Sequence, residues 1–157
     1  FQKLNLEIYK EDCVPLFFVD PMHEIIAVAH AGWKGTLGNI AANVVAKIIE
    51  LGGNSKSTYC WIGPHIGACC YGVPKERIDA FGVINDPQAA IENGGQWYLD
   101  VGYLNRKQLM ESGVLPEHID AHPTCTSCQN NTFFSYRKEK TTVGSVQENM
   151  GFITFIR

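Results

Sequence analysis

The sequence lacks the features that mark several large classes of protein. It has no apolar run long enough to cross a bilayer, so we do not expect insertion into a membrane. It has no block of Lys and Arg, and its net charge of −3 and pI of about 5.9 argue against a nucleic-acid partner. A glycine-rich nucleotide fingerprint, a P-loop and internal repeats are also absent. The sequence therefore favours a small-molecule ligand.

Two metal-binding patterns are missing as well. The five histidines form no His-x-His pair, which argues against the paired imidazoles of a multicopper cluster. There is no His-x-Glu motif, and Thr124 separates Pro123 from Cys125, so the zinc signature of the nucleobase deaminases is absent. Copper-dependent oxidation and that deaminase class are therefore poor explanations of this sequence.

The composition is that of an ordinary globular protein. The 157 residues are 45% hydrophobic and 18% charged. A chain of this length fits one domain that buries about 68–70% of its unfolded surface. Because such a core needs no disulfide bonds, the six cysteines predict reduced thiols and a cytoplasmic location. Phe1 is not an initiator methionine, so we expect the sequence to be a fragment of a longer protein.

A cysteine and a histidine stand beside neighbouring apolar runs near the N-terminus. Residues 4–8 alternate as in a half-buried strand that leads to Cys13, and residues 16–19 and 25–29 predict two more strands, the last ending at His30. If these strands are neighbours, the thiol and the imidazole lie close together. Such a pair can hold a soft divalent metal, or the imidazole can activate the thiol as a nucleophile. Since free cysteine and strand histidine are often ordinary buried groups, the residues alone also permit a purely structural interpretation.

A helix is predicted directly after the segment His30-Ala31-Gly32-Trp33-Lys34-Gly35. Apolar residues recur at spacings of three and four over residues 37–49, and Gly52 follows as a stop signal. The free backbone N–H groups at the helix start and the Lys34 ammonium could together receive an anion. The alternative is that Thr36 only caps the helix and that Lys34 is solvated.

The rest of the chain predicts short elements. Turn residues interrupt it often, and the loop at residues 63–71 is rich in glycine. The predicted elements are a strand at 59–62, helices at 74–81, 86–92 and 104–111, a strand or helix entry at 97–101, and a closing strand at 152–156.

A second group of cysteines has a spacing that invites a metal interpretation. Cys125-x-x-Cys128 is spaced like a pair of zinc ligands, and its only possible partner pair is Cys69-Cys70. Two adjacent cysteines lack the intervening residues that let two thiolates bind one metal ion. We therefore do not expect a four-cysteine zinc site, and Cys69 and Cys70 suit apolar packing equally well.

Arg137 follows an aromatic run. A guanidinium held there offers a bidentate fork to phosphate or carboxylate. The alternative is a surface arginine whose stem lies over Phe134 and Tyr136.

Four motifs, in order along nearly the whole chain, make the sequence similar to the YfiH/YlmD family. This family was once labelled multicopper polyphenol oxidase or laccase and is regarded as a family of purine nucleoside phosphorylases that also deaminate adenosine. Each motif is weak alone, but the four together are specific. They are Asp12-Cys13-Val14-Pro15, Ala29-His30-Ala31-Gly32-Trp33-Lys34-Gly35, Ile62-Gly63-Pro64-His65-Ile66-Gly67, and Cys125-Thr126 with Phe133-Phe134-Ser135-Tyr136-Arg137.

The resemblance implies a fold, a cofactor and an activity. The fold is a layered α/β/β/α fold with mixed sheets, in which residues 1–157 form a single YfiH-like domain that lacks an N-terminal segment of the full fold. The cofactor is zinc, held by one cysteine and two histidines; Cys13 and His30 match the cysteine and the second histidine, and no residue here matches the first. The activity is zinc-dependent phosphorolysis of adenosine, inosine, guanosine or methylthioadenosine, with deamination of adenosine to inosine. Cys13 and His30 are then the metal ligands and catalytic residues, and Lys34 and Arg137 bind phosphate.

Two other functions remain open on the residues alone. The first is a metal-free cysteine hydrolase in which Cys13 is the nucleophile and His30 the base, which needs no third ligand. The second is a non-catalytic purine-binding domain. Neither alternative, nor the phosphorylase hypothesis, fixes the oligomeric state.

Overall fold

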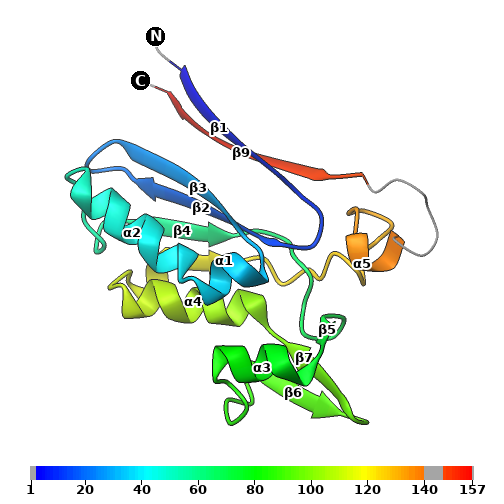
Figure 1. Cartoon of the computed structure of the whole chain (residues 1–157). Helices are drawn as coiled ribbons and strands as arrows, with labels where there is room; N and C mark the ends of the chain where they lie inside the picture. Colours follow the sequence, from blue (N-terminus) through cyan, green and yellow to red (C-terminus); the bar gives the residue numbers. More distant parts are fainter. Residues whose placement is uncertain (1–2, 140–146, 157) are drawn as a thin grey trace.

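The computed structural model describes residues 3–139 and 147–156, which form three β-sheets and several helices (Figure 1). None of the helices in these ranges is long and apolar enough to cross a membrane. In chain order the elements are β1 (Lys3–Lys10), β2 (Val14–Asp20), β3 (Ile25–Ala31), α1 (Trp33–Leu37), α2 (Ile40–Glu50), β4 (Tyr59–Ile62), β5 (Gly72–Val73), α3 (Lys75–Phe81), β6 (Ala90–Asn93), β7 (Gln96–Leu99), α4 (Val101–Glu111), the 3-10 turn η1 (Pro116–His118), β8 (Ile119–Ala121), α5 (Tyr136–Glu139) and β9 (Asn149–Ile156).

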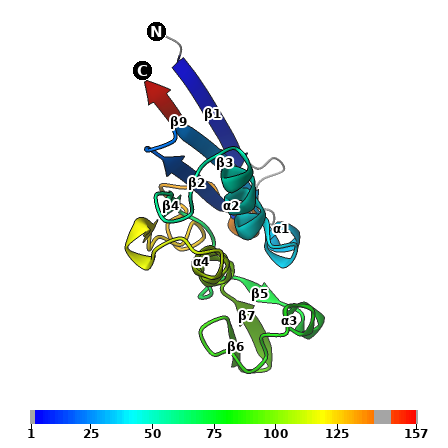
Figure 2. The same cartoon turned by 90° about the vertical axis from the view of Figure 1, so that its left-hand side faces the viewer.

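The central layer is a four-stranded mixed sheet of order β3-β2-β4-β8. β2 is antiparallel to β3 and β4, whereas β4 and β8 are parallel. Leu16 and Phe18 of β2 are completely buried, as expected for an apolar run at the centre of a sheet. The helices α2 and α4 lie side by side over one face of this sheet (Figures 1 and 2). Their apolar residues, such as Val45 and Leu109, complete the core.

A two-stranded ribbon of β1 and β9 packs on the other face of the sheet. The two strands are antiparallel over their whole length, so the two ends of the chain lie together (Figure 1). A Cβ on Gly151 would come within 2.6 Å of the Phe17 ring, which shows how closely the ribbon approaches β2. Among the described residues no helix covers the outer side of the ribbon, where Tyr9, Met150 and Phe152 are exposed. The predicted layered α/β fold with mixed sheets is confirmed.

A small antiparallel sheet of order β5-β7-β6 lies beyond α4, with α3 packed beside it (Figure 2). β6 and β7 form a hairpin whose turn contains Gly94 and Gly95, both at positive φ. A two-residue hairpin turn of this kind favours glycine because other residues rarely adopt that backbone conformation.

Two predictions of local structure differ from the structure. The helix predicted over residues 37–49 is present from Ile40 as α2, but Leu37 belongs to the separate helix α1, because Asn39 adopts the left-handed conformation (φ 57°) after Gly38. The helix at residues 86–92 is instead a turn followed by strand β6. Asp86 accepts hydrogen bonds from the backbone of Gln88 and Ala89, and β6 then pairs with β7.

Candidate functional site

Cys13 and His30 lie at the same end of adjacent strands. Pro15 of β2 is directly opposite His30 of β3, so these two side chains share one face of the sheet. Cys13 precedes β2, and its Sγ lies 3.2 Å from the position that a Cβ on Gly32 would occupy. The predicted strands are neighbours, and they bring the Cys13 thiol beside Gly32, which follows His30 by two residues.

Cys13 borders a small cavity of about 50 Å³, which we call the thiol cavity. Burial raises the pKa of the Cys13 thiol, and the carboxylates of Glu11 and Asp12 raise it further. His30 is exposed, and no hydrogen bond joins it to Cys13 among the described residues. A protonated thiol without a base is a poor nucleophile. The cavity is lined by Asp12, Cys13, Ala31, Gly32, Trp33, Ile66, Tyr71 and Val101.

Asp12, next to Cys13, is held by distant parts of the chain. Its carboxylate accepts a hydrogen bond from the Thr126 hydroxyl and one from the backbone N–H of Arg137, each at 2.7 Å. Its carbonyl accepts a third from the Ile66 N–H at 2.9 Å. These contacts fix the backbone that presents Cys13. Asp12 lies in the Asp-Cys-Val-Pro motif, but no local pattern in the sequence indicates these contacts.

Three cationic side chains gather at the aromatic wall of the thiol cavity. The Arg137 guanidinium lies 5.2 Å from the centre of the Tyr71 ring, and that of Arg77 lies 4.2 Å from the Trp33 ring. Arg77 also donates to the Tyr71 hydroxyl at 3.4 Å, and the Lys34 ammonium lies 5.6 Å from the Trp33 ring. Cations favour the faces of aromatic rings. The sequence singled out Lys34 and Arg137 but missed Arg77, because nothing in α3 indicates that it packs against Trp33.

A larger, mostly apolar cavity of about 330 Å³ lies near Pro15 between the sheet and the ribbon. The rings of Phe17, Trp61 and Phe133 line it, together with the nearly buried Lys10. Burial lowers the pKa of Lys10 to about 8. The size and the aromatic walls suit a planar heterocycle.

Comparison with known proteins identifies the family. Residues 2–154 match the sequence model described as multi-copper polyphenol oxidoreductase laccase. The chain belongs to this family. The resemblance to the YfiH and YlmD proteins is thereby confirmed.

The relatives of this laccase-like chain include enzymes and a solved structure. It is 38% identical over 144 residues to purine nucleoside phosphorylase YlmD of Bacillus subtilis (strain 168), covering 89% of this chain and 52% of that protein. It is 33% identical over 141 residues to adenosine deaminase RL5 from an unknown prokaryotic organism, covering 87% and 54%. The crystal structure of the hypothetical protein YfiH from Bacillus licheniformis superimposes with a TM-score of 0.88 at 34% identity, over 98% of this chain and 58% of that one. The chain spans about half the length of the curated relatives it matches.

The zinc site implied by the family resemblance needs three ligands, and the described residues do not complete it. No third histidine, cysteine or carboxylate within reach of a shared ion joins Cys13 or His30 in residues 3–139 and 147–156. The donors present therefore fit only part of that site. We derive no reaction step through a metal bound there.

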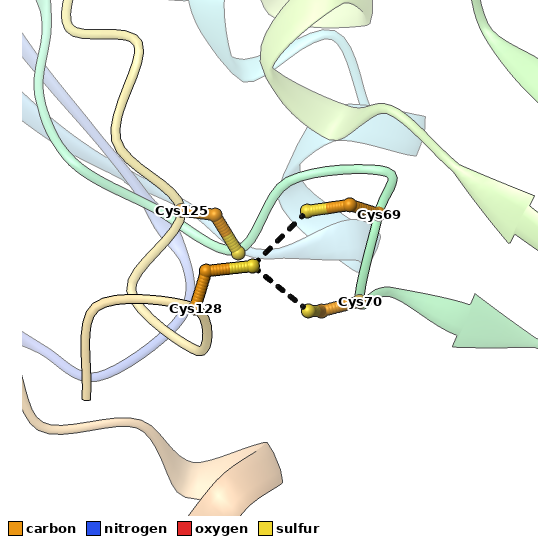
Figure 3. Close-up of side chains that lie close together, drawn as sticks. All are labelled: Cys69, Cys70, Cys125 and Cys128. Atoms are coloured by element: carbon orange, nitrogen blue, oxygen red, sulfur yellow. Dashed lines mark hydrogen bonds between the residues drawn. The ribbon is translucent and has the colours of Figure 1, made fainter.

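A different group of potential metal ligands lies close together. The sulfur atoms of Cys69, Cys70, Cys125 and Cys128 all lie within 4.8 Å of one another (Figure 3). We did not expect a four-cysteine zinc site because Cys69 and Cys70 are adjacent, but a tight turn brings these two thiols close to those of Cys125 and Cys128. In that turn the N–H of Cys70 donates to the carbonyl of Gly67 at 3.0 Å. This cluster of four cysteines could bind a metal.

Proposed function

We propose that this chain forms a site for the phosphorolysis of purine nucleosides, with phosphate held at the cationic wall of the thiol cavity. The observation that carries the proposal is the convergence of Arg77 and Arg137 on Tyr71, beside Cys13. The names of the purine nucleoside phosphorylases among the relatives support it. Adenosine, inosine, guanosine and methylthioadenosine are the substrates we propose.

Phosphorolysis requires cationic groups that bind phosphate. A phosphate oxygen forms a bond to the anomeric carbon of the ribose as the bond to the purine nitrogen breaks, and the purine leaves with a proton. The phosphate dianion must be held in line with that bond. Arginine guanidiniums offer paired N–H donors that match phosphate oxygens, and Lys34 adds a third positive charge. The aromatic cavity beside Pro15 would receive the purine ring.

Deamination of adenosine is a second candidate activity, favoured by the similarity to adenosine deaminase RL5. Replacing the amino group of adenine needs an activated water, which a zinc ion would supply. Cys13 and His30 are the residues we propose for that zinc. Because the described residues offer no third donor beside them, we assign no residue to the activation of water.

The metal-free cysteine hydrolase receives less support from the geometry. That mechanism needs a thiolate, and burial raises the pKa of Cys13. It also needs a base in hydrogen-bond contact, and no described hydrogen bond joins His30 to Cys13.

Product analysis tests the proposal. The protein is incubated with adenosine in the presence and absence of phosphate, and the products are separated by chromatography. We expect adenine and ribose 1-phosphate only when phosphate is present, and inosine would reveal the deaminase activity. Binding of adenosine without any product would instead favour the non-catalytic purine-binding domain. Adenine released equally well without phosphate would contradict phosphorolysis.

The cationic wall makes a specific kinetic prediction. Replacing Arg77 with alanine is expected to raise the KM for phosphate by roughly 10- to 150-fold, because one hydrogen bond to a charged group contributes about 1.5–3 kcal/mol. The KM for the nucleoside should change little. Lys75→Ala is the matched control, since Lys75 lies in the same helix and pairs with Asp79. An unchanged KM for phosphate in Arg77→Ala would place the phosphate elsewhere.

A further inference from the structure

The four clustered cysteines come from two loops that the fold brings together. Cys69 and Cys70 lie in the loop between β4 and β5, and Cys125 and Cys128 lie in the loop that follows β8 (Figure 3). The Cys128 sulfur is 3.6 Å from that of Cys69 and 3.4 Å from that of Cys70. Four thiolates at about 2.3 Å from a tetrahedral zinc lie about 3.8 Å apart. The sulfur spacing is thus close to that of a single coordinated ion and well beyond the roughly 2.05 Å of a disulfide bond.

We propose that Cys69, Cys70, Cys125 and Cys128 bind one zinc ion in a tetrahedral thiolate site that fastens these two loops together. This site shares no residue with the one-cysteine, two-histidine set that the family resemblance implies. The inference does not depend on the proposed enzymatic function.

The backbone around the cluster arranges the ligands before any ion binds. A parallel bridge joins His65 to Cys125, and the N–H of Thr126 donates to the carbonyl of His65 at 3.0 Å. The N–H of Gly67 donates to the Cys125 sulfur at 3.2 Å. Such N–H···S contacts orient metal-bound thiolates. A Cβ on Gly67 would lie 3.4 Å from the Cβ of Cys125 in the other loop, so the absence of a side chain lets the loops approach closely.

The ligand chemistry favours zinc. Four soft thiolates in tetrahedral geometry select zinc or iron. All four sulfurs lie within 4.8 Å of one another, which suits one ion at their centre rather than a cluster of several metal atoms. Cys69 and Cys128 are exposed, which gives an ion a path of entry. A site that only joins two loops needs no redox change, and zinc has none.

The two loops also reach the candidate active site. Thr126 lies between Cys125 and Cys128, and its hydroxyl donates to the Asp12 carboxylate at 2.7 Å. The other loop continues from Cys70 to Tyr71, which lines the thiol cavity. Zinc at the cysteine cluster would therefore hold in place the contacts that position Asp12 and the aromatic wall.

Metal analysis tests this site directly. In a Cys13→Ala background, which removes any contribution from Cys13, we expect about one zinc per chain after purification under reducing conditions. Adding Cys128→Ser should reduce the zinc content to near zero and lower the melting temperature. Cys60→Ala is the matched control, because Cys60 is buried in β4 away from the cluster, and its zinc content should not change. Unchanged zinc in Cys128→Ser, or iron in place of zinc, would overturn the proposal.

If the variants fail to fold, the proposed metal site can be tested on the metal-free protein with all its cysteines. Titration with Co²⁺ should produce the absorption of a cobalt ion bound by four tetrahedral thiolates, which Cys13 and His30 together cannot produce. Cobalt spectra without tetrahedral thiolate bands would overturn the site. Mass spectrometry that finds two hydrogens fewer per cysteine pair in freshly purified, zinc-free protein would do the same, because it would assign these thiols to a disulfide.

Discussion

Replacing Cys13 with alanine is expected to lower purine nucleoside phosphorolysis by about 100-fold or more and to leave the protein folded. Cys13 is half-buried at the edge of the thiol cavity and lies outside the main cluster of buried apolar residues. Its sulfur is the only one among the residues that line that cavity. The substitution therefore removes the thiol proposed as a metal ligand beside the phosphate-binding wall, at a small cost in packing.

The measurement is the rate of phosphate-dependent cleavage of adenosine, compared with thermal unfolding of the same samples. Cys60→Ala is the contrasting control, because it should lose stability and keep activity. Cys60 is only 2% exposed, so its truncation should cost about 1–2 kcal/mol of stability and leave the activity per folded molecule intact. If Cys13→Ala retained full activity, the proposed role of Cys13 as a metal ligand would be lost, and the cysteine hydrolase alternative would be excluded as well.

The sequence predicted well those elements that depend on local pattern. The apolar runs of β2, β3 and β4 and the turn at Asp20 are visible in the chain because a buried strand needs little beyond its own apolar residues. β6 was missed because its pairing with β7 decides its conformation against a weak local preference. The pairing of β1 with β9 joins opposite ends of the chain, and no local pattern specifies such a partner.

The candidate site likewise contains residues that the sequence indicated and residues that it did not. Motifs identified Cys13, His30, Lys34 and Arg137 as residues of interest, and their roles stay predictions. Arg77 was missed because its contact with Trp33 is long-range, and its hydrogen bond to Tyr71 spans a loop and the start of α3 that no local pattern specifies. A four-cysteine zinc site was not expected because adjacent cysteines have no residues between them. That spacing rule describes two thiolates that bind one metal from a single short segment. Here the turn at Gly67 directs two adjacent thiols toward a second loop, so the spacing in three dimensions differs from that in the sequence.

Asp20 should be one of the largest single contributors to stability. It is completely buried at the end of β2. Alanine at this position leaves four donors without their acceptor, so we expect a loss of about 3 kcal/mol in the free energy of unfolding. A loss of this size corresponds to a fall of roughly 6–12 °C in melting temperature. The Asp20 carboxylate accepts hydrogen bonds from the N–H of Asn54 at 2.8 Å, the Ser57 hydroxyl at 2.9 Å, the N–H of Met22 at 3.2 Å and Nδ1 of His23 at 2.8 Å.

Urea unfolding of Asp20→Ala beside the wild type measures this loss. Asp79→Ala is the control, because Asp79 is an exposed carboxylate whose salt bridge with Lys75 should contribute less than about 1 kcal/mol. Equal losses in the two variants would contradict a special role for the buried carboxylate.

Measuring the difference in unfolding free energy between wild type and Asp20→Ala at several pH values identifies the cause of the stability loss. Burial alone would raise the pKa of Asp20, but the hydrogen bonds from Asn54, Ser57 and His23 lower it further than burial raises it, so the net pKa lies below its ordinary value. A carboxyl group whose pKa is lower in the folded state stabilises the protein fully above its unfolded pKa of about 3.9. That contribution is lost as the pH falls through the folded value. The difference between wild type and Asp20→Ala should therefore be fully present at about pH 5 and shrink below about pH 4. A difference that did not change with acid would assign the loss to packing instead of to the charged acceptor.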